Sequence, residues 1–225
     1  MGFMTRWGGP FGLIPRRQGN TYFVAPAASY TIEGRSYVAS DDGGHDGLSP
    51  ERALLTMQRA ITLSTANAGD VIVLLEGTHT VTATVNINKA GLTFWGISSA
   101  TDAFNIYKPT TILTSTGTSD ELLNITGNNT EMAYMTLRPT TAFDAVTFQT
   151  NDAAISNVYF HHCHFDLYTP AVSVHTFGIN FAVRSSTAPT ADQAQTTAAI
   201  SGALIEDCTF ESDGAQGRAV KIATA

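Results

Sequence analysis

The chain has 225 residues, of which 14% are charged and 43% are hydrophobic, and its formal net charge is −7. A chain of this length and apolar content can bury one large core, which excludes intrinsic disorder. The acidic balance and the lack of a basic run argue against nucleic acid as a partner, since phosphate binding needs clustered Lys and Arg. The chain contains 32 Thr residues, and the β-branched side chain of Thr favours extended structure.

Residues 1–40 show no sustained strand or helix period, so we expect an irregular N-terminal arm with one short strand at residues 37–39. The arm is either a loosely packed extension or an anchor that contacts a partner subunit. Aromatic and Arg side chains dominate interface energetics. No apolar run has signal-peptide or transmembrane length, so we expect no membrane partner. The candidate partner-binding residues are Arg6, Trp7, Phe11, Arg16, Arg17, Tyr22 and Phe23.

Residues 41–70 are predicted to form a turn and then a helix that caps the following domain. Ser49 is a good N-cap and Pro50 suits the first helical turn. Apolar residues then recur at three- and four-residue steps from Leu54 to Ile61. This pattern predicts one amphipathic helix from about residue 50 to 66.

Three acidic residues, Asp41, Asp42 and Asp46, lie in the turn before this helix. Carboxylate oxygens are the ligands that Ca²⁺ prefers, so they are candidates for a structural calcium site. Asp and Gly together are also ordinary turn-forming residues, which is the alternative. We expect no other cofactor.

From residue 71 to 225 the sequence consists of short β runs separated by Gly, Asn, Thr and Pro, which predicts an all-β domain. Several residues recur at a constant offset, which a jelly roll or sandwich would not give. We therefore predict a parallel β-solenoid of about 5–7 coils of 22–24 residues, with an insertion at about 177–198. Three pairs have an offset of 23: Ile125 and Phe148, Asn128 and Asn151, and Met132 and Ile155.

Two expectations about stacked side chains follow from this repeat. Asn128 over Asn151 would form an amide ladder in a turn. Cys163 and Cys208 are 45 residues apart, or two repeats. We expect both to point inward, two coils apart and unbonded.

Two segments resemble known proteins. The stretch 37–81, with DGLSPERALLTMQRAI and GDVIVLLEGTHTV, is followed by N-x-x-F-x-x-C-x-F at 157–165. It resembles right-handed parallel β-helix proteins of the pectate-lyase-like superfamily, which implies a single-stranded β-helix with an N-terminal capping helix. That superfamily includes lyases, hydrolases, phage tailspikes and catalytically silent virion proteins, so it implies little about activity. The stretch TRWGGPFGLIPRRQGNTYFVAPAASY is similar to N-terminal anchors of bacteriophage virion proteins.

Catalysis on this fold would need paired carboxylates or a carboxylate with a basic residue. Asp207 is the repeat equivalent of His162, and Glu206 precedes it. With one coil between them, Asp207 and His162 would lie about 10 Å apart. These three residues are the candidate catalytic set, although a solvated face also explains them. The other strand-region acids are Asp144, Asp152, Asp166 and Glu211.

The run His161, His162, Cys163 and His164 suggests metal chemistry. In a regular strand His162 and His164 would share one face and supply two ligands. No third ligand is visible, so we predict no metal site there.

These observations favour a non-enzymatic structural protein of a bacteriophage virion. It would be a head-decoration, fibre or tail-associated protein, a homotrimer attached to capsid or tail proteins through the N-terminal arm. The alternative is a polysaccharide-binding or polysaccharide-degrading tailspike, a lyase or glycoside hydrolase, with a host surface glycan as partner.

Overall fold

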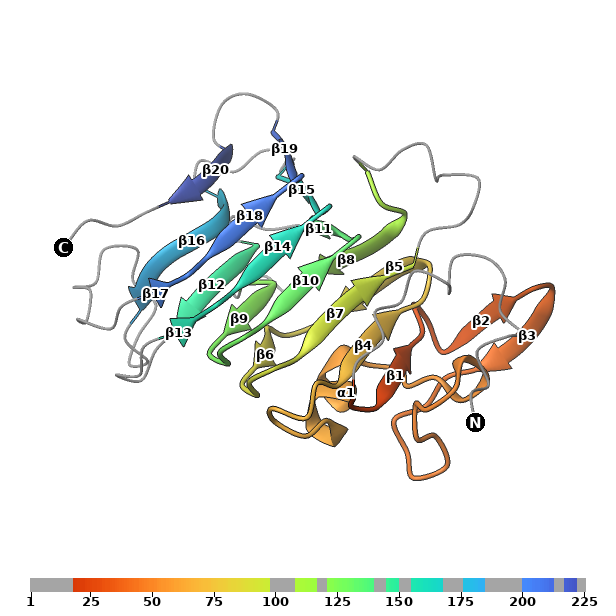
Figure 1. The fold of residues 1–225 in the computed structure, drawn as a ribbon. Coiled ribbons are helices and arrows are strands. Elements are labelled where there is room, and N and C mark those ends of the chain that lie inside the picture. Colours follow the sequence, from red (N-terminus) through yellow and green to blue (C-terminus); the bar gives the residue numbers. More distant parts are fainter. Residues whose placement is uncertain are drawn as a thin grey trace.

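The structure, a computed structural model, describes residues 18–97, 108–116, 121–139, 145–149, 155–167, 176–184, 200–212 and 217–221. In this part the chain is all-β, with one α-helix, α1 (Met57–Leu63), and one short 3-10 helix, η3 (Pro50–Arg52). Most of the strands form three parallel sheets, in each of which successive strands lie side by side along the molecule (Figure 1). The predicted all-β class is confirmed, and the arrangement is consistent with a parallel β-helix or a related fold.

The three sheets are built from strands that are far apart in the sequence. Sheet 1 contains β1 (Thr21–Val24), β4 (Val71–Leu74), β7 (Thr93–Gly96), β10 (Glu131–Ala133), β14 (Tyr159–His161) and β18 (Leu204–Glu206). Sheet 2 contains β5 (Gly77–Val81), β8 (Thr111–Ser115), β11 (Thr136–Arg138), β15 (His164–Asp166) and β19 (Thr209–Glu211). Sheet 3 contains β6 (Val85–Ile87), β9 (Leu123–Ile125), β12 (Val146–Gln149), β16 (Thr176–Arg184) and β20 (Gly217–Lys221).

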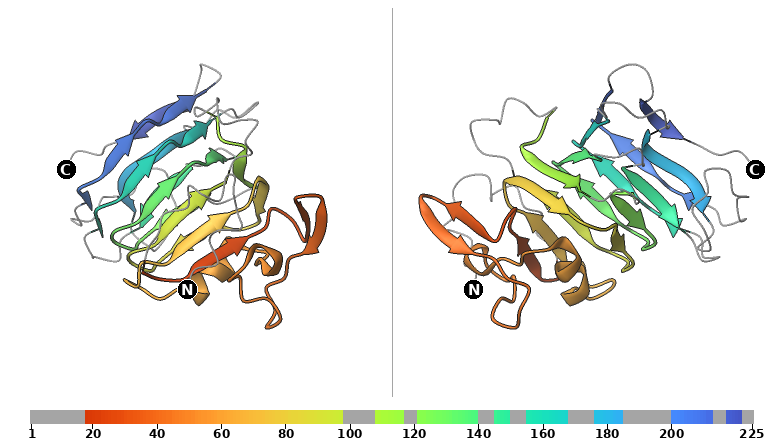
Figure 2. Two further views of the ribbon diagram at one scale, coloured as in Figure 1. Left: turned by 45° about the vertical axis from the view of Figure 1, so that its right-hand side comes forward. Right: turned by 180° about the vertical axis from the view of Figure 1, so that it is seen from behind.

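Two smaller pairings complete the described strands. A short parallel pair joins β13 (Ile155–Ser156) to β17 (Ile200–Ser201). An antiparallel hairpin joins β2 (Ser29–Ile32) to β3 (Arg35–Val38). The hairpin lies beside the N-terminal end of the stack, as Figure 2 shows.

From β4 onward the described strands visit sheets 1, 2 and 3 in the same order five times, and we call each such passage a layer. Paired strand residues of one layer lie over their equivalents in the layer before, so side chains of one kind form ladders. The inward ladder of sheet 1 is apolar and almost completely buried in its middle layers. It consists of Tyr22, Ile72, Phe94, Met132, Phe160 and Ile205.

The register corrects the predicted repeat. Thr93 follows its partner Val71 by 22 residues, but the next three steps in sheet 1 are 38, 28 and 45 residues. Among the described strand pairs, the 23-residue step is found only between β9 and β12 in sheet 3, where Val146 lies opposite Leu123 and Thr147 opposite Asn124. Met132 pairs with Phe160 and not with Ile155, so that predicted equivalence is wrong. The strands keep their pairing while the connections between them vary in length, which hides the period.

Amide ladders form, but at other residues than predicted. Asn151 lies outside the described residues. Asn157 Nδ2 donates to Asn129 Oδ1 at 3.0 Å, and Asn124 Nδ2 donates to Asn86 Oδ1 at 3.0 Å. Each bond joins neighbouring layers, one between strands β6 and β9 and one in the turns before β10 and β14, so these polar side chains are satisfied along the stack.

The expected irregular arm is wrong for residues 21–38. These residues form β1, the first strand of sheet 1, and the β2–β3 hairpin. The predicted insertion at 177–198 is also corrected at its start, because β16 covers residues 176–184 and pairs with both β12 and β20. Residues 1–17 and 185–199 lie outside the described part, and the domain boundaries at 40 and 70 remain predictions.

A helix forms in the predicted region but is shorter than the predicted 50–66. Pro50–Arg52 forms η3, and α1 begins only at Met57. Between them Leu54 is extended, because it makes a parallel bridge to Val24 at the end of β1. The helix packs against β1, β4 and β6, and its buried face includes Ala60.

Candidate functional site

One residue in each of three layers makes the corner between sheet 1 and sheet 2. Tyr134, His162 and Asp207 follow β10, β14 and β18, and all three adopt a left-handed backbone, with φ of 57°, 54° and 48°. The strands before them are in register, so these three residues stack; we call them the corner ladder. Gly96, the last residue of β7, is the register equivalent of Tyr134, and a Cβ there would meet the Tyr134 carbonyl oxygen at 2.1 Å. Glycine is required at that layer because the two backbones approach so closely.

The corner ladder brings two predicted catalytic candidates together. His162 Nε2 lies 3.8 Å from Asp207 Oδ2. The expected separation across an intervening coil is therefore wrong, since the 45-residue step is a single layer. On the other side of His162 the ring of Tyr134 stacks at 4.7 Å between centroids and 21° between planes.

The outer face of β14 and β18 extends this site with further polar contacts. The phenol of Tyr159 donates to a carboxylate oxygen of Glu206, its neighbour in the next layer. This hydrogen bond raises the pKa of Tyr159 to about 12, so the hydroxyl remains a donor at neutral pH. His161 Nε2 lies 3.1 Å from Glu131 Oε1, and its Nδ1 lies 3.1 Å from Nδ1 of His162.

Aromatic rings hold these polar groups in place. The ring of Tyr159 stacks on His161 at 4.5 Å and 28°. Trp95, which is almost completely buried, contacts Tyr134 at 4.6 Å and also meets His161 edge-on. The aromatic and polar residues of this face form the corner site: Trp95, Glu131, Tyr134, Tyr159, His161, His162, Glu206 and Asp207.

The corner site offers hydrogen-bond donors, acceptors and ring faces at one edge of the molecule. Glu206 and Asp207 are exposed, whereas Tyr134 and Tyr159 are half-buried. Such groups suit recognition of a polar ligand that also has apolar surface. Sequence reasoning missed Tyr134 and Tyr159, because only the register shows that they lie next to His162 and Glu206.

The remaining strand carboxylates in the described part form ion pairs on sheet 2. Asp166 Oδ2 accepts from Arg138 Nε at 2.7 Å. Glu211 pairs with Lys108, and the hydrogen bond from that ammonium lowers the pKa of Glu211. Two other predicted carboxylate candidates, Asp144 and Asp152, lie outside the described residues.

The histidine run does not form the predicted strand face. The chain turns at His162, so His164 begins β15 in a different sheet. His164 is 3% exposed, its Nδ1 lies 2.7 Å from Thr209 Oγ1, and burial lowers its pKa. Among the described residues, no three His, Cys, Asp or Glu side chains are grouped so that they could hold a metal ion.

Cys163 and Cys208 both face the core and are unbonded, as predicted. They are not two coils apart, because Cys163 and Cys208 belong to successive layers of the stack. The hydrogen bond from Thr209 N to Cys163 O, 2.9 Å long, lies between those layers.

The three acidic residues of the 41–46 loop accept hydrogen bonds from backbone N–H groups of the loop and of the segment that follows it. Asp41 Oδ1 accepts from Leu55 N at 2.8 Å and from Thr56 N at 3.0 Å. Asp42 Oδ1 accepts from Gly44 N at 2.8 Å. Asp46 accepts from the backbone of Leu48 and pairs with the guanidinium of Arg52. These contacts are typical of Asx turns and capping.

The structure places two candidate partner-binding residues in the interior. Tyr22 is 7% exposed and Phe23 is 9% exposed, since β1 is covered by its neighbours on both faces. The prediction that Tyr22 and Phe23 are surface anchors is therefore wrong, because both are core residues. The other five candidates, residues 6, 7, 11, 16 and 17, lie outside the described part.

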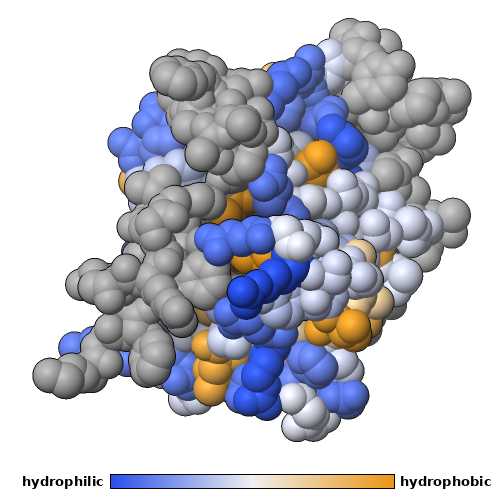
Figure 3. Space-filling model, turned by 90° about the vertical axis from the view of Figure 1, so that its right-hand side faces the viewer, coloured by the Kyte–Doolittle hydropathy of each residue, from blue (hydrophilic) through white to orange (hydrophobic). Residues whose placement is uncertain are grey.

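At the N-terminal end of the stack Val38 and Leu48 are exposed apolar residues, and Figure 3 shows apolar patches between polar ones on that side.

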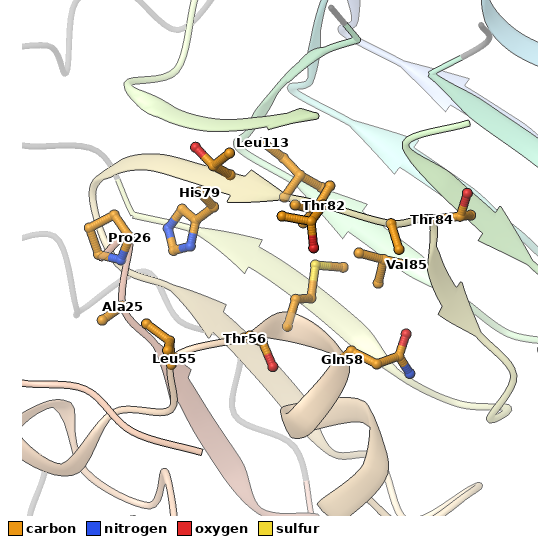
Figure 4. A pocket seen from close by; sticks show the side chains of 14 residues that line it. Ala25, Pro26, Leu55, Thr56, Gln58, His79, Thr82, Thr84, Val85 and Leu113 are labelled. Carbon is orange, nitrogen blue, oxygen red and sulfur yellow. The ribbon is translucent and has the colours of Figure 1, made fainter. Parts of the chain in front are cut away.

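A pocket of about 190 Å³ lies between the start of α1 and the β5–β6 connection (Figure 4). Threonines 80, 82 and 84 line it together with Met57 and His79. His79 Nε2 lies 2.7 Å from the Leu75 carbonyl oxygen, which only accepts, so Nε2 carries the proton. Burial lowers the pKa of His79 to about 4, and the ring is neutral at pH 7.

Comparison of the chain with protein-family models, with curated proteins and with solved structures found no match. No helix in the described residues is long and apolar enough to cross a membrane.

Proposed function

We propose that this protein is a structural component of a bacteriophage particle. Its three sheets would form a right-handed, single-stranded parallel β-helix, and residues 1–17 would attach it to a capsid or tail protein. The particle would carry it as a homotrimer, assembled in the host cytoplasm. The function would be mechanical, as a head-decoration, fibre or tail-associated protein.

The observation that carries this proposal is the shared register of the three parallel sheets. Stacked layers satisfy their backbone groups laterally, so a chain with 14% charged residues can form an extended, rigid body. Side-chain hydrogen bonds between neighbouring layers, from Asn157 to Asn129 and from Tyr159 to Glu206, act along the same axis. A rigid body with an N-terminal attachment segment suits a part that projects from a particle.

Incorporation into particles tests the proposal. The full chain and a Trp7→Ala/Phe11→Ala variant would be supplied to particles that lack the wild-type protein, and purified particles would be analysed by mass spectrometry. We expect wild-type protein in stoichiometric amounts and loss of the variant, with both proteins folded by circular dichroism. A protein that is absent from purified particles would overturn the proposal.

A second candidate function, glycan binding, is favoured by the corner site alone. Half-buried Tyr134 and Tyr159 present ring surface beside the exposed carboxylates of Glu206 and Asp207. Sugar hydroxyls would donate to the carboxylates, and the rings would pack on the apolar faces of the sugar. Turnover of the glycan would further need Glu206, Asp207 and His162 to act on the glycosidic bond.

Incubation of the protein with host surface glycans distinguishes a binding module from an enzyme. Binding without release of oligosaccharides would indicate a binding module, and release that Glu206→Gln and Asp207→Asn abolish would indicate an enzyme. Glu33→Gln is the matched control, since Glu33 is an exposed carboxylate in the distant β2–β3 turn. No binding at all would exclude this second function and leave the structural proposal in place.

A further inference from the structure

Cys163 and Cys208 lie directly opposite each other in neighbouring layers. The pairing of β14 with β18 and that of β15 with β19 have the same 45-residue offset on either side of the two cysteines. The backbone stays paired between them, because Thr209 N donates to Cys163 O at 2.9 Å. The two residues are therefore equivalent positions of one ladder.

Their side chains have the same orientation. Cys163 Sγ lies 3.5 Å from the carbonyl oxygen of His161, and Cys208 Sγ lies 3.3 Å from that of Glu206. In each case the acceptor is the residue two positions earlier, so both thiols point into the core from the same side of the corner. Both pack against the same apolar cluster.

This geometry lies within the range of a disulfide. Neighbouring strands of a sheet are separated by about 4.8 Å, and bridged cysteines have Cα atoms about 4.4 to 6.8 Å apart. Because the two thiols already face the same core, closing the bond needs side-chain rotation and little movement of the backbone.

We propose that Cys163 and Cys208 form a redox-active thiol pair that oxidises to an intrachain disulfide and cross-links two successive layers of the stack. The oxidant is a small-molecule disulfide of the glutathione class. The Cys208 thiolate attacks one sulfur of that disulfide and forms a mixed disulfide, and the first glutathione leaves as a thiolate. Cys163 then loses its proton to solvent and attacks Cys208 Sγ, and the second glutathione leaves. Two protein thiols are oxidised, and one glutathione disulfide is reduced to two thiols.

The environments of the two thiols set this order. Cys208 is partly exposed, whereas Cys163 is 1% exposed. A hydrogen bond from the Cys163 side chain lowers the pKa of Cys208, and burial raises the pKa of Cys163. Thiolates are the attacking species in disulfide exchange, so the accessible cysteine reacts first and the buried one resolves the mixed disulfide.

The test is oxidation of the native full-length protein in glutathione buffers of increasing oxidised fraction. Remaining thiols would be blocked with N-ethylmaleimide, and intact mass and non-reduced peptides would be analysed. We expect a protein lighter by two hydrogen atoms, a peptide pair joined through Cys163 and Cys208, and a higher unfolding temperature that dithiothreitol reverses. Cys163→Ser should stop at a Cys208–glutathione adduct, and Cys208→Ser should stay unmodified.

Stable glutathionylation of wild-type Cys208 without the cross-link would overturn the proposal. So would a disulfide between two chains, or thiols that both react with N-ethylmaleimide after the most oxidising buffer. Circular dichroism of the two single variants confirms that they fold. The readout is independent of any particle or glycan, so its failure leaves the proposed function untouched.

Discussion

Phe165 and Phe210 stack on neighbouring layers of sheet 2, with 4.6 Å between ring centroids and 7° between ring planes. Phe165 is completely buried, whereas Phe210 in the last described layer is only partly buried. The same residue type at the same ladder position therefore has two different environments, which makes a matched pair of substitutions.

Phe165→Ala should lower the free energy of unfolding by about 3–5 kcal/mol, because it removes a buried ring and leaves a cavity. Phe210→Ala should cost less than half of this, since part of its ring already contacts solvent and its site can collapse. Chemical denaturation of both variants measures the difference. Equal losses would contradict the layer order.

Replacing Asp41 should destabilise the start of α1. The carboxylate accepts from two backbone N–H groups and from the hydroxyl of Thr56, the N-cap residue. Asp41→Ala should cost about 1–2 kcal/mol, as for the loss of a helix cap. Glu33→Ala is the control, because its exposed side chain should change the free energy of unfolding by less than about 0.5 kcal/mol.

The loop of Asp41, Asp42 and Asp46 also gives a test for calcium. Each carboxylate already accepts a backbone N–H within the loop or from its neighbours. We expect the unfolding temperature in excess Ca²⁺ to equal that in a chelator. A rise in Ca²⁺ that Asp42→Asn removes would instead establish the calcium site, through mass action on the folded state.

His79 should make the protein sensitive to acid. Its pKa falls from 6.5 to about 4 on folding, so the unfolded chain binds this proton more tightly. The contribution to stability is complete above pH 6.5 and is lost as the pH falls towards 4, and its upper limit is about 3 kcal/mol. His79→Gln should flatten the free energy of unfolding between pH 7 and 4, compared with wild type. A wild-type slope in His79→Gln would refute the assignment.

Tyr159 should make the free energy of unfolding depend on pH at alkaline pH. Its pKa rises from 10.0 to about 12 because the phenol donates to Glu206. The stabilisation is present below pH 10 and is lost as the pH rises through 12. Tyr159→Phe should cost about 0.5 kcal/mol at pH 7, the lower end for a partly exposed hydrogen bond. Spectrophotometric titration of the phenols should show one late-titrating tyrosine that the variant lacks.

The sequence predicted the fold class because strand composition and turn residues are local signals. It also identified Cys163 and Cys208, and His162 and Asp207, as equivalent positions. It assigned the wrong number of layers between them, because a long connection and two short repeats give the same 45-residue offset. Tyr22 and Phe23 were misassigned since the amino acids of an interface anchor and of a core strand are the same.

The sequence alone also could not predict the composition of the corner site. Tyr134, Tyr159 and Glu131 belong to different layers than their partners, and nothing local marks them. The predicted helix was too long because Leu54 has the apolar spacing of a helix face. In the structure the backbone of Leu54 instead pairs with Val24 of β1.

We propose that this chain is a β-helical component of a phage particle, and a high-resolution electron cryo-microscopy reconstruction of purified particles tests this most directly. We expect density at stoichiometric occupancy in which Tyr159 lies beside Leu204 and residues 1–17 contact a capsid or tail protein. Particles with no such density, or with this chain in a different strand register, would contradict it.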